Sequence, residues 1–75
     1  MTRPEVSAAI LALGDATPGL AGAHLVEAGR AIADGTAEMR GHIVNRIKRV
    51  ASTLRIVGGP VADAYGKAAE IVSAL

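Results

Sequence analysis

Residues 36–57 constrain the fold more than any other part of this 75-residue chain. Apolar side chains recur there every three or four positions, and on a helix of 3.6 residues per turn that spacing places them along one side. The resulting apolar seam consists of Met39, Ile43, Ile47, Val50, Leu54 and Val57. The pattern predicts one long amphipathic helix. Because the segments before and after it also have helical spacing, we expect an all-α fold.

The same helix carries most of the positive charge of the chain. We name as the basic set the cations Arg40, Arg46, Lys48, Arg49 and Arg55. At 100° per residue, His42, Arg46 and Arg49 project to one flank of the helix. Lys48 and Arg55, seven positions apart, project to the other flank. The helix can therefore bury its seam and still present cations to solvent.

Three breaks that contain glycine interrupt the helical pattern. The first is Gly14–Gly19, where Thr17 can act as the N-cap of the segment that follows. At the second, Gly35 can close one helix and Thr36 can cap the next, so we place the apex of a hairpin there. The third is the sequence Gly-Gly-Pro at 58–60, which breaks or bends the helix before it.

We expect these breaks to shape one antiparallel, kinked helical hairpin. Its arms would cover about residues 5–34 and 36–74, with bends near 14–17 and 58–60 and the apex near Gly35. The two bends lie at similar distances from the apex, so both arms could bend at the same level. Each arm would reach roughly 45–55 Å at 1.5 Å per residue. Residues 1–75 would form this single domain.

Residues 20–34 have a wide apolar face that includes Gly22 and Gly29. Glycine inside a helix costs about 1 kcal/mol relative to alanine. Unless the two glycines are simply tolerated, they therefore indicate close contact with another backbone. Each helix of a hairpin covers only one stripe of the other, which would leave part of each wide face exposed. We therefore expect many copies of the chain to pack together.

Composition sets further limits. The chain has no Cys and therefore no disulfide, and Tyr65 is its only aromatic residue, so its core must consist of small aliphatic side chains. Gln is absent and Asn45 is the only Asn. Hyperthermophile proteins show this depletion, and the codon usage of a GC-rich mesophile would also give it. The uncharged runs are shorter than the roughly 20 residues that span a bilayer, and the N-terminus makes a poor signal peptide.

The common signatures of enzymes are missing. The chain has no phosphate-binding loop, dinucleotide fingerprint, zinc-protease motif, paired-cysteine motif or nucleophile elbow. His24 and His42 are isolated and form no cluster of metal ligands. We therefore expect no catalytic residue, no metal site, no cofactor and no small-molecule substrate.

The basic set is the one functional candidate of substance. It can be an ordinary solvated helix face, or it can contact the phosphates of a nucleic acid with little base readout, since the chain has no Asn- or Gln-rich reading surface. A basic amphipathic helix can also bind anionic lipid. The absence of Trp and Phe makes a membrane the weaker expectation.

With these features the chain resembles the small major coat proteins of rod-shaped archaeal viruses, the clavavirus type in particular. The similarity covers the whole length and is one of overall character. It rests on a very small, Cys-free helical hairpin, rich in Ala, Gly and Val, with basic residues grouped in its middle. The resemblance implies a self-assembling capsid protein, with many copies around circular double-stranded DNA in a virion. It also implies that the basic set faces the DNA through non-specific phosphate contacts.

A secreted interaction protein is the alternative. Leu54-Arg-Ile56, followed by Ala62-Asp-Ala-Tyr65 and Glu70, looks like the C-terminal part of the small helical-hairpin substrates of actinobacterial type VII secretion. The chain lacks the Trp-x-Gly turn of those proteins, and its acidic residue follows Tyr65 by five positions instead of four. A membrane-active, bacteriocin-like peptide is a further alternative, which the seven acidic residues disfavour.

Overall fold

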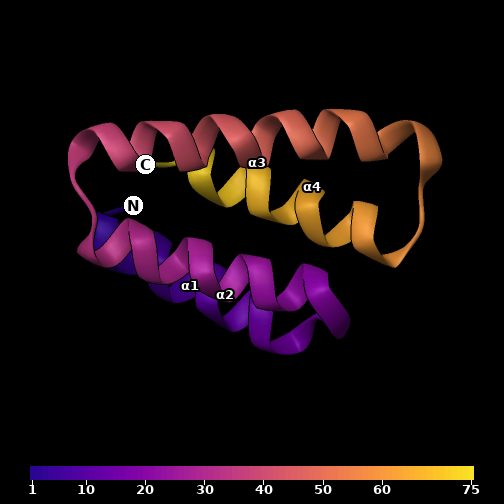
Figure 1. Ribbon diagram of the computed structural model, residues 1–75, viewed down its shortest axis with the longest axis horizontal. Coiled ribbons are helices and arrows are strands. Elements are labelled where there is room, and N and C mark those ends of the chain that lie inside the picture. The colour runs from indigo at the N-terminus through magenta and orange to yellow at the C-terminus, as the bar shows by residue number, and fades with distance from the viewer.

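The computed structural model describes residues 1–75 and consists of four helices joined by short turns (Figure 1). The helices are α1 (Arg3–Ala16), α2 (Gly19–Asp34), α3 (Ala37–Val57) and α4 (Pro60–Ser73). No strand interrupts this order. The prediction of an all-α fold is confirmed.

Side-chain caps define the starts of α1 and α3. α1 begins at a capping box, in which the Glu5 amide donates to the Thr2 hydroxyl at 3.3 Å and the Thr2 amide donates to the Glu5 carboxylate at 2.9 Å. These bonds satisfy amides that a helix start leaves without partners. The Met39 amide donates to the Thr36 hydroxyl at 3.2 Å. The predicted cap at Thr36 is therefore confirmed.

The predicted N-cap at Thr17 is wrong. Thr17 ends α1, and its hydroxyl donates back to the Leu13 carbonyl at 2.7 Å, so it has no role in starting α2. Pro18 takes the N-cap position of α2 without a side-chain hydrogen bond. Gly19 follows with a φ of 76°, a conformation that favours glycine because it has no Cβ. Pro18 and Gly19 therefore reverse the chain.

The breaks predicted as bends within two long arms are full turns. α1 and α2 lie side by side, and so do α3 and α4, so each predicted arm folds back on itself (Figure 1). Gly58 and Gly59, with φ of 74° and 99°, make the second of these turns. The longest dimension of the molecule is 32 Å, well below the roughly 45–55 Å predicted for each arm. The predicted long hairpin is thus corrected to two short ones, and Gly35 lies at the junction between them.

Close backbone contact draws α1 and α2 together. A Cβ added to Gly22 would lie 2.7 Å from the carbonyl oxygen of Gly14, and one added to Gly29 would lie 2.8 Å from a side-chain carbon of Leu11. The buried Ser7 hydroxyl donates to the Gly29 carbonyl at 2.7 Å. The predicted close contact at Gly22 and Gly29 is confirmed. Its partner is α1 of the same chain, and this contact makes the first break a turn.

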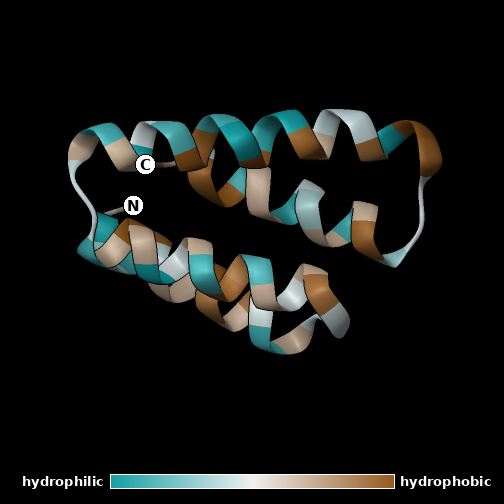
Figure 2. Cartoon of the chain, viewed as in Figure 1, coloured by the Kyte–Doolittle hydropathy of each residue, from teal (hydrophilic) through white to brown (hydrophobic).

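The hydrophobic core lies between the two hairpins, and all four helices contribute to it. Its buried members are Val6, Ile10, Leu25, Ala28, Ile32, Ile47, Ala64, Tyr65, Ala68 and Val72. Only one of them belongs to α3, whose polar residues gather on its outer side (Figure 2). The four helices pack around this core, and the packing of many copies stays a prediction. No helix combines the length and apolarity that crossing a bilayer requires.

Candidate nucleic-acid interface

α3 forms the edge of the molecule and carries the whole basic set. Ile47 is its only buried residue. Met39 and Val57, the two ends of the predicted apolar seam, are 49% and 79% exposed. The buried part of the seam is therefore shorter than predicted, because α3 extends beyond the helices that it packs against. The other residues of α3 are exposed or half-buried.

Arg40 differs from the other members of the basic set. It is half-buried, and its Nη1 donates to the Gly35 carbonyl at 2.8 Å. That carbonyl lies in the turn between α2 and α3, so the guanidinium links the first turn of α3 to the end of α2. Arg40 therefore has a structural contact that its position in the basic set did not indicate.

Arg46 and Arg49 are exposed on one flank of α3, together with His42. Residues three positions apart are neighbours on a helix surface, so the two guanidinium groups form one local cluster of positive charge. Glu38, in the first turn, is the only acidic residue of α3. This flank is therefore a cationic surface that phosphate oxygens can approach.

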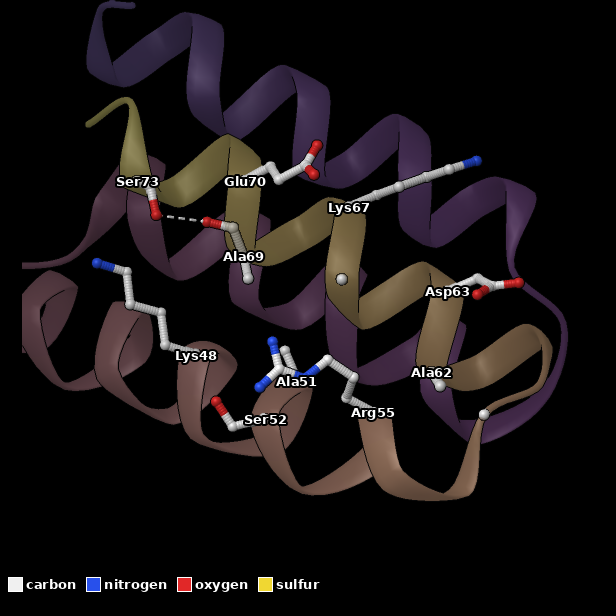
Figure 3. A pocket seen from close by; sticks show the side chains of 12 residues that line it. Lys48, Ala51, Ser52, Arg55, Ala62, Asp63, Lys67, Ala69, Glu70 and Ser73 are labelled. Atoms are coloured by element: carbon white, nitrogen blue, oxygen red, sulfur yellow. Dashed lines mark hydrogen bonds between the residues drawn. The ribbon is translucent and has the colours of Figure 1, made fainter.

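Lys48 and Arg55 lie on the other flank and line a groove between α3 and α4, about 890 Å³ in volume. Figure 3 shows both side chains reaching from α3 toward this groove, while Asp63 and Glu70 stand on the α4 side. Between them the lining consists of Lys67 of α4 and of small residues, which include Ala51, Ser52, Gly66, Ala69 and Ser73. The basic set is thus divided into three parts. Arg40 makes a structural contact, Arg46 and Arg49 form an exposed flank, and Lys48 and Arg55 line a groove.

Sequence reasoning missed the groove and its acidic rim. Asp63 and Glu70 are seven positions apart, as are Lys48 and Arg55. A spacing of seven residues places both members of a pair on the same side of a helix. The shared spacing of seven indicates in the sequence that each pair lies on one side of its helix. Only the packing of α3 beside α4 brings the two pairs to the same groove.

The outer face of α2 carries a third pair with this spacing, Glu27 and Asp34, and Arg30 lies between them. All three are exposed, and Leu20, one further heptad before Glu27, is 78% exposed. We name these four residues the α2 face. The three charged residues lie away from the buried side of α2, which Leu25, Ala28 and Ile32 occupy.

The turn between α3 and α4 forms an apolar tip. Ile56, Val57 and Val61 are 91%, 79% and 43% exposed there, beside Gly58 and Gly59. Large apolar side chains gathered at one exposed place are typical of contact sites. Val57 was predicted as part of the buried seam, and its exposure is a correction.

The structure contains no group of three or more His, Asp or Glu side chains that could hold a metal ion. Comparison with models of protein families, with characterised proteins and with solved structures finds no match to this chain. Function is therefore inferred from the surfaces described above. Of these, the cationic flank of α3 has the most definite chemistry.

Proposed function

We propose that the protein is a self-assembling structural subunit that binds double-stranded DNA through phosphate contacts from α3. One observation carries the proposal: Arg46 and Arg49 are exposed side by side on a helix whose single carboxylate lies in its first turn. Guanidinium groups bind phosphate oxygens with charge-assisted, often bidentate hydrogen bonds. The flank of α3 is therefore the surface that would meet the DNA backbone.

The contact would not depend on DNA sequence. Reading of bases in a groove relies on side chains such as Asn and Gln at suitable positions, and α3 offers only Asn45 beside its cations. Phosphate contacts position a protein on the duplex without distinguishing its bases. This is the behaviour that a coat or packaging protein requires.

Two exposed arginines in one copy give weak binding, and many linked copies give strong binding. When one copy is bound, its neighbours are held close to the same DNA at a high effective concentration. The resemblance to the coat proteins of rod-shaped archaeal viruses gives a setting for this arrangement. In that setting the protein would be the major capsid protein of a virion and would enclose the DNA.

The DNA contact is tested by replacing Arg46 and Arg49 together with alanine and measuring binding to a labelled duplex at several salt concentrations. Each phosphate contact contributes about 0.9 to the slope of log affinity against log salt, so we expect the slope to fall by about 1.8. A matched pair of single variants, Arg46→Ala and Arg3→Ala, removes one charge from the flank of α3 or from α1, and Arg3→Ala should leave the slope unchanged. Equal losses in both variants, or no binding by the wild type, would refute the DNA contact.

The coat role makes a separate prediction for material from the native source. One Tyr and no Trp leave the protein almost dark at 280 nm, so strong absorbance at 260 nm from nuclease-treated, very large particles would report protected DNA. A small species without nucleic acid would contradict the coat role. That result would favour the secreted alternative, which predicts a monomer or small oligomer.

A second candidate function is contact with an anionic lipid surface, and the apolar tip favours it. Ile56 and Val57 project into solvent beside the exposed Arg55, which combines side chains that enter the headgroup region with a charge that attracts it. Ile56→Ser with Val57→Ser should then abolish co-sedimentation with phosphatidylserine vesicles. If the wild-type protein stays in the supernatant, this second function is excluded.

A further inference from the structure

We infer that the α2 face of one copy docks into the α3–α4 groove of the next copy. The inference deepens the proposed function and rests on its self-assembly part, because it names the two surfaces by which copies join. Both surfaces are exposed, they lie on different helices, and their charges are complementary.

The groove has the shape to receive a helix. Its lining between the charged side chains consists of small residues, and a Cβ added to Gly66 would meet no atom within 4 Å. A backbone can approach closely where side chains are this small. Lining residues of both helices, among them Ser52 of α3 and Ser73 of α4, are exposed to solvent. A helix from another copy can therefore lie along the groove.

The charges of the groove differ between its two sides. Lys48 and Arg55 reach into it from α3, whereas the α4 rim carries Asp63, Lys67 and Glu70 and has one negative charge in excess (Figure 3). The members of each pair are two helical turns apart, about 10.5 Å along the axis at 1.5 Å per residue. An incoming helix fits best if it brings carboxylates toward α3 and a cation toward α4.

The α2 face has this arrangement. Glu27 and Asp34 share the two-turn spacing of the cations on α3, so both carboxylates can meet both cations. Arg30 lies about 60° to one side of Glu27 at 100° per residue. It can therefore point to the rim that carries Asp63 and Glu70 when the carboxylates point into the groove.

The side on which Arg30 lies fixes the direction of the docked helix. Because the α-helix is right-handed, Arg30 turns toward α4 only if the docked α2 runs parallel to α4 and antiparallel to α3. Glu27 then lies opposite Arg55, and Asp34 lies opposite Lys48. In the reverse direction Arg30 would face only the two cations of α3, whereas the α4 rim offers it the carboxylates of Asp63 and Glu70 on either side of Lys67.

The docking is heterologous, which explains how a small closed bundle can form an extended assembly. Each copy uses its α2 face in the groove of one neighbour and keeps its own groove for another. A head-to-tail contact of this kind yields a ring or an open filament. Arg46 and Arg49 lie on the opposite flank of α3, outside the groove. A row of docked copies would therefore repeat the cationic flank along its length.

Charge reversal tests the docking. In one variant, Glu27→Lys and Asp34→Lys make the α2 face cationic; in the other, Lys48→Glu and Arg55→Glu make the groove anionic. By sedimentation velocity we expect large assemblies for the wild type and monomers for each variant alone. An equimolar mixture should assemble again, because the face of each variant then complements the groove of the other. A wild-type monomer, or a mixture that stays monomeric although both variants remain helical, would overturn the docking.

Two controls separate specific docking from attraction between oppositely charged proteins. Asp15→Lys with Glu38→Lys gives the same net charge as the first variant but leaves both surfaces intact, so it should assemble like the wild type. Gly66→Leu fills the groove without changing any charge and should prevent assembly. If this leucine variant assembles normally, the groove is not the docking site.

The outcome is independent of the DNA contact. Arg46→Ala with Arg49→Ala should leave assembly unchanged and weaken DNA binding. Assembly without DNA binding would support the docking and refute the DNA role. DNA binding by a wild-type protein that stays monomeric would support the DNA role and refute the docking.

Discussion

The two helical hairpins use glycine in opposite ways. In α1 and α2, Gly14, Gly22 and Gly29 lie where one backbone approaches the other, and an added Cβ would collide with neighbouring atoms. In α3 and α4, Gly41 and Gly66 lie inside helices where an added Cβ would meet nothing. The backbones of the first hairpin are therefore in close contact. The second hairpin leaves more room between its helices and carries the groove, the apolar tip and the cationic flank.

Glycine substitutions should give the largest difference between the hairpins. In Gly22→Ala the new Cβ would lie 1.8 Å from the Thr17 carbonyl oxygen, so the backbone must move. We expect a loss of about 3 kcal/mol in the free energy of unfolding, or failure to fold. Gly41→Ala, in the exposed interior of α3, should instead gain up to about 1 kcal/mol from helix propensity. Urea denaturation measures both, and similar values for the two variants would contradict the contrast.

The next largest difference should come from truncating a buried side chain of the first hairpin and an exposed side chain of the second. Ile10 of α1 is fully buried, whereas Ile56 of α3 is 91% exposed. Ile10→Ala should cost about 2–5 kcal/mol, because it removes buried apolar surface and leaves a cavity. Ile56→Ala should change stability by less than about 0.5 kcal/mol. Thermal unfolding checks both values, and a large loss in Ile56→Ala would show that the tip is covered, as in an assembly.

A smaller effect is expected from the hydrogen bond that joins α1 to α2. Ser7→Ala removes the hydroxyl that donates to the Gly29 carbonyl, and a buried hydrogen bond of this kind contributes about 1 kcal/mol. Ser52→Ala, in the exposed wall of the groove, is the matched control and should be neutral. If the two variants unfold at the same urea concentration, the bond does not hold the hairpin together.

The positions of the helices were predictable because the signals that set them are local. The cap at Thr36 and the break at Gly58 and Gly59 act within a few residues, and the sequence showed them. The difference between a bend and a turn was not predictable in this way. It depends on contact between Gly14 and Gly22 across two helices, and the isolated pattern of each helix does not reveal their register.

The same distinction between local signals and contacts between helices applies to the candidate site. The two flanks of α3 followed from angles on one helix, so Arg46 and Arg49 could be separated from Lys48 and Arg55 before the structure was known. The groove could not be predicted, because it requires α4 to lie beside α3. Nor could the contact of Arg40 with Gly35, because it depends on how the chain turns between the two hairpins.

The starts of α1 and α4, one helix from each hairpin, should differ in their response to pH, and this is the smallest expected effect. Hydrogen bonds from the Thr2 backbone and side chain hold the pKa of Glu5 below its ordinary value of 4.5. A carboxylate with a lowered pKa in the folded state stabilises the fold above its unfolded pKa, and that contribution is lost as the pH falls through the folded pKa. α4 begins at Gly59 without any side-chain cap, so its start has no corresponding bond.

Glu5→Gln tests this difference, because the amide can still accept the bond but cannot titrate. Melting temperatures should show a constant offset between wild type and variant above about pH 5, and the offset should shrink as the pH falls below about 4.5. Parallel curves across the acid range would mean that the capping box does not hold Glu5 in solution. The start of α1 would then fray as freely as that of α4, and the first hairpin would depend on its glycine contacts, its buried side chains and the bond from Ser7 to Gly29.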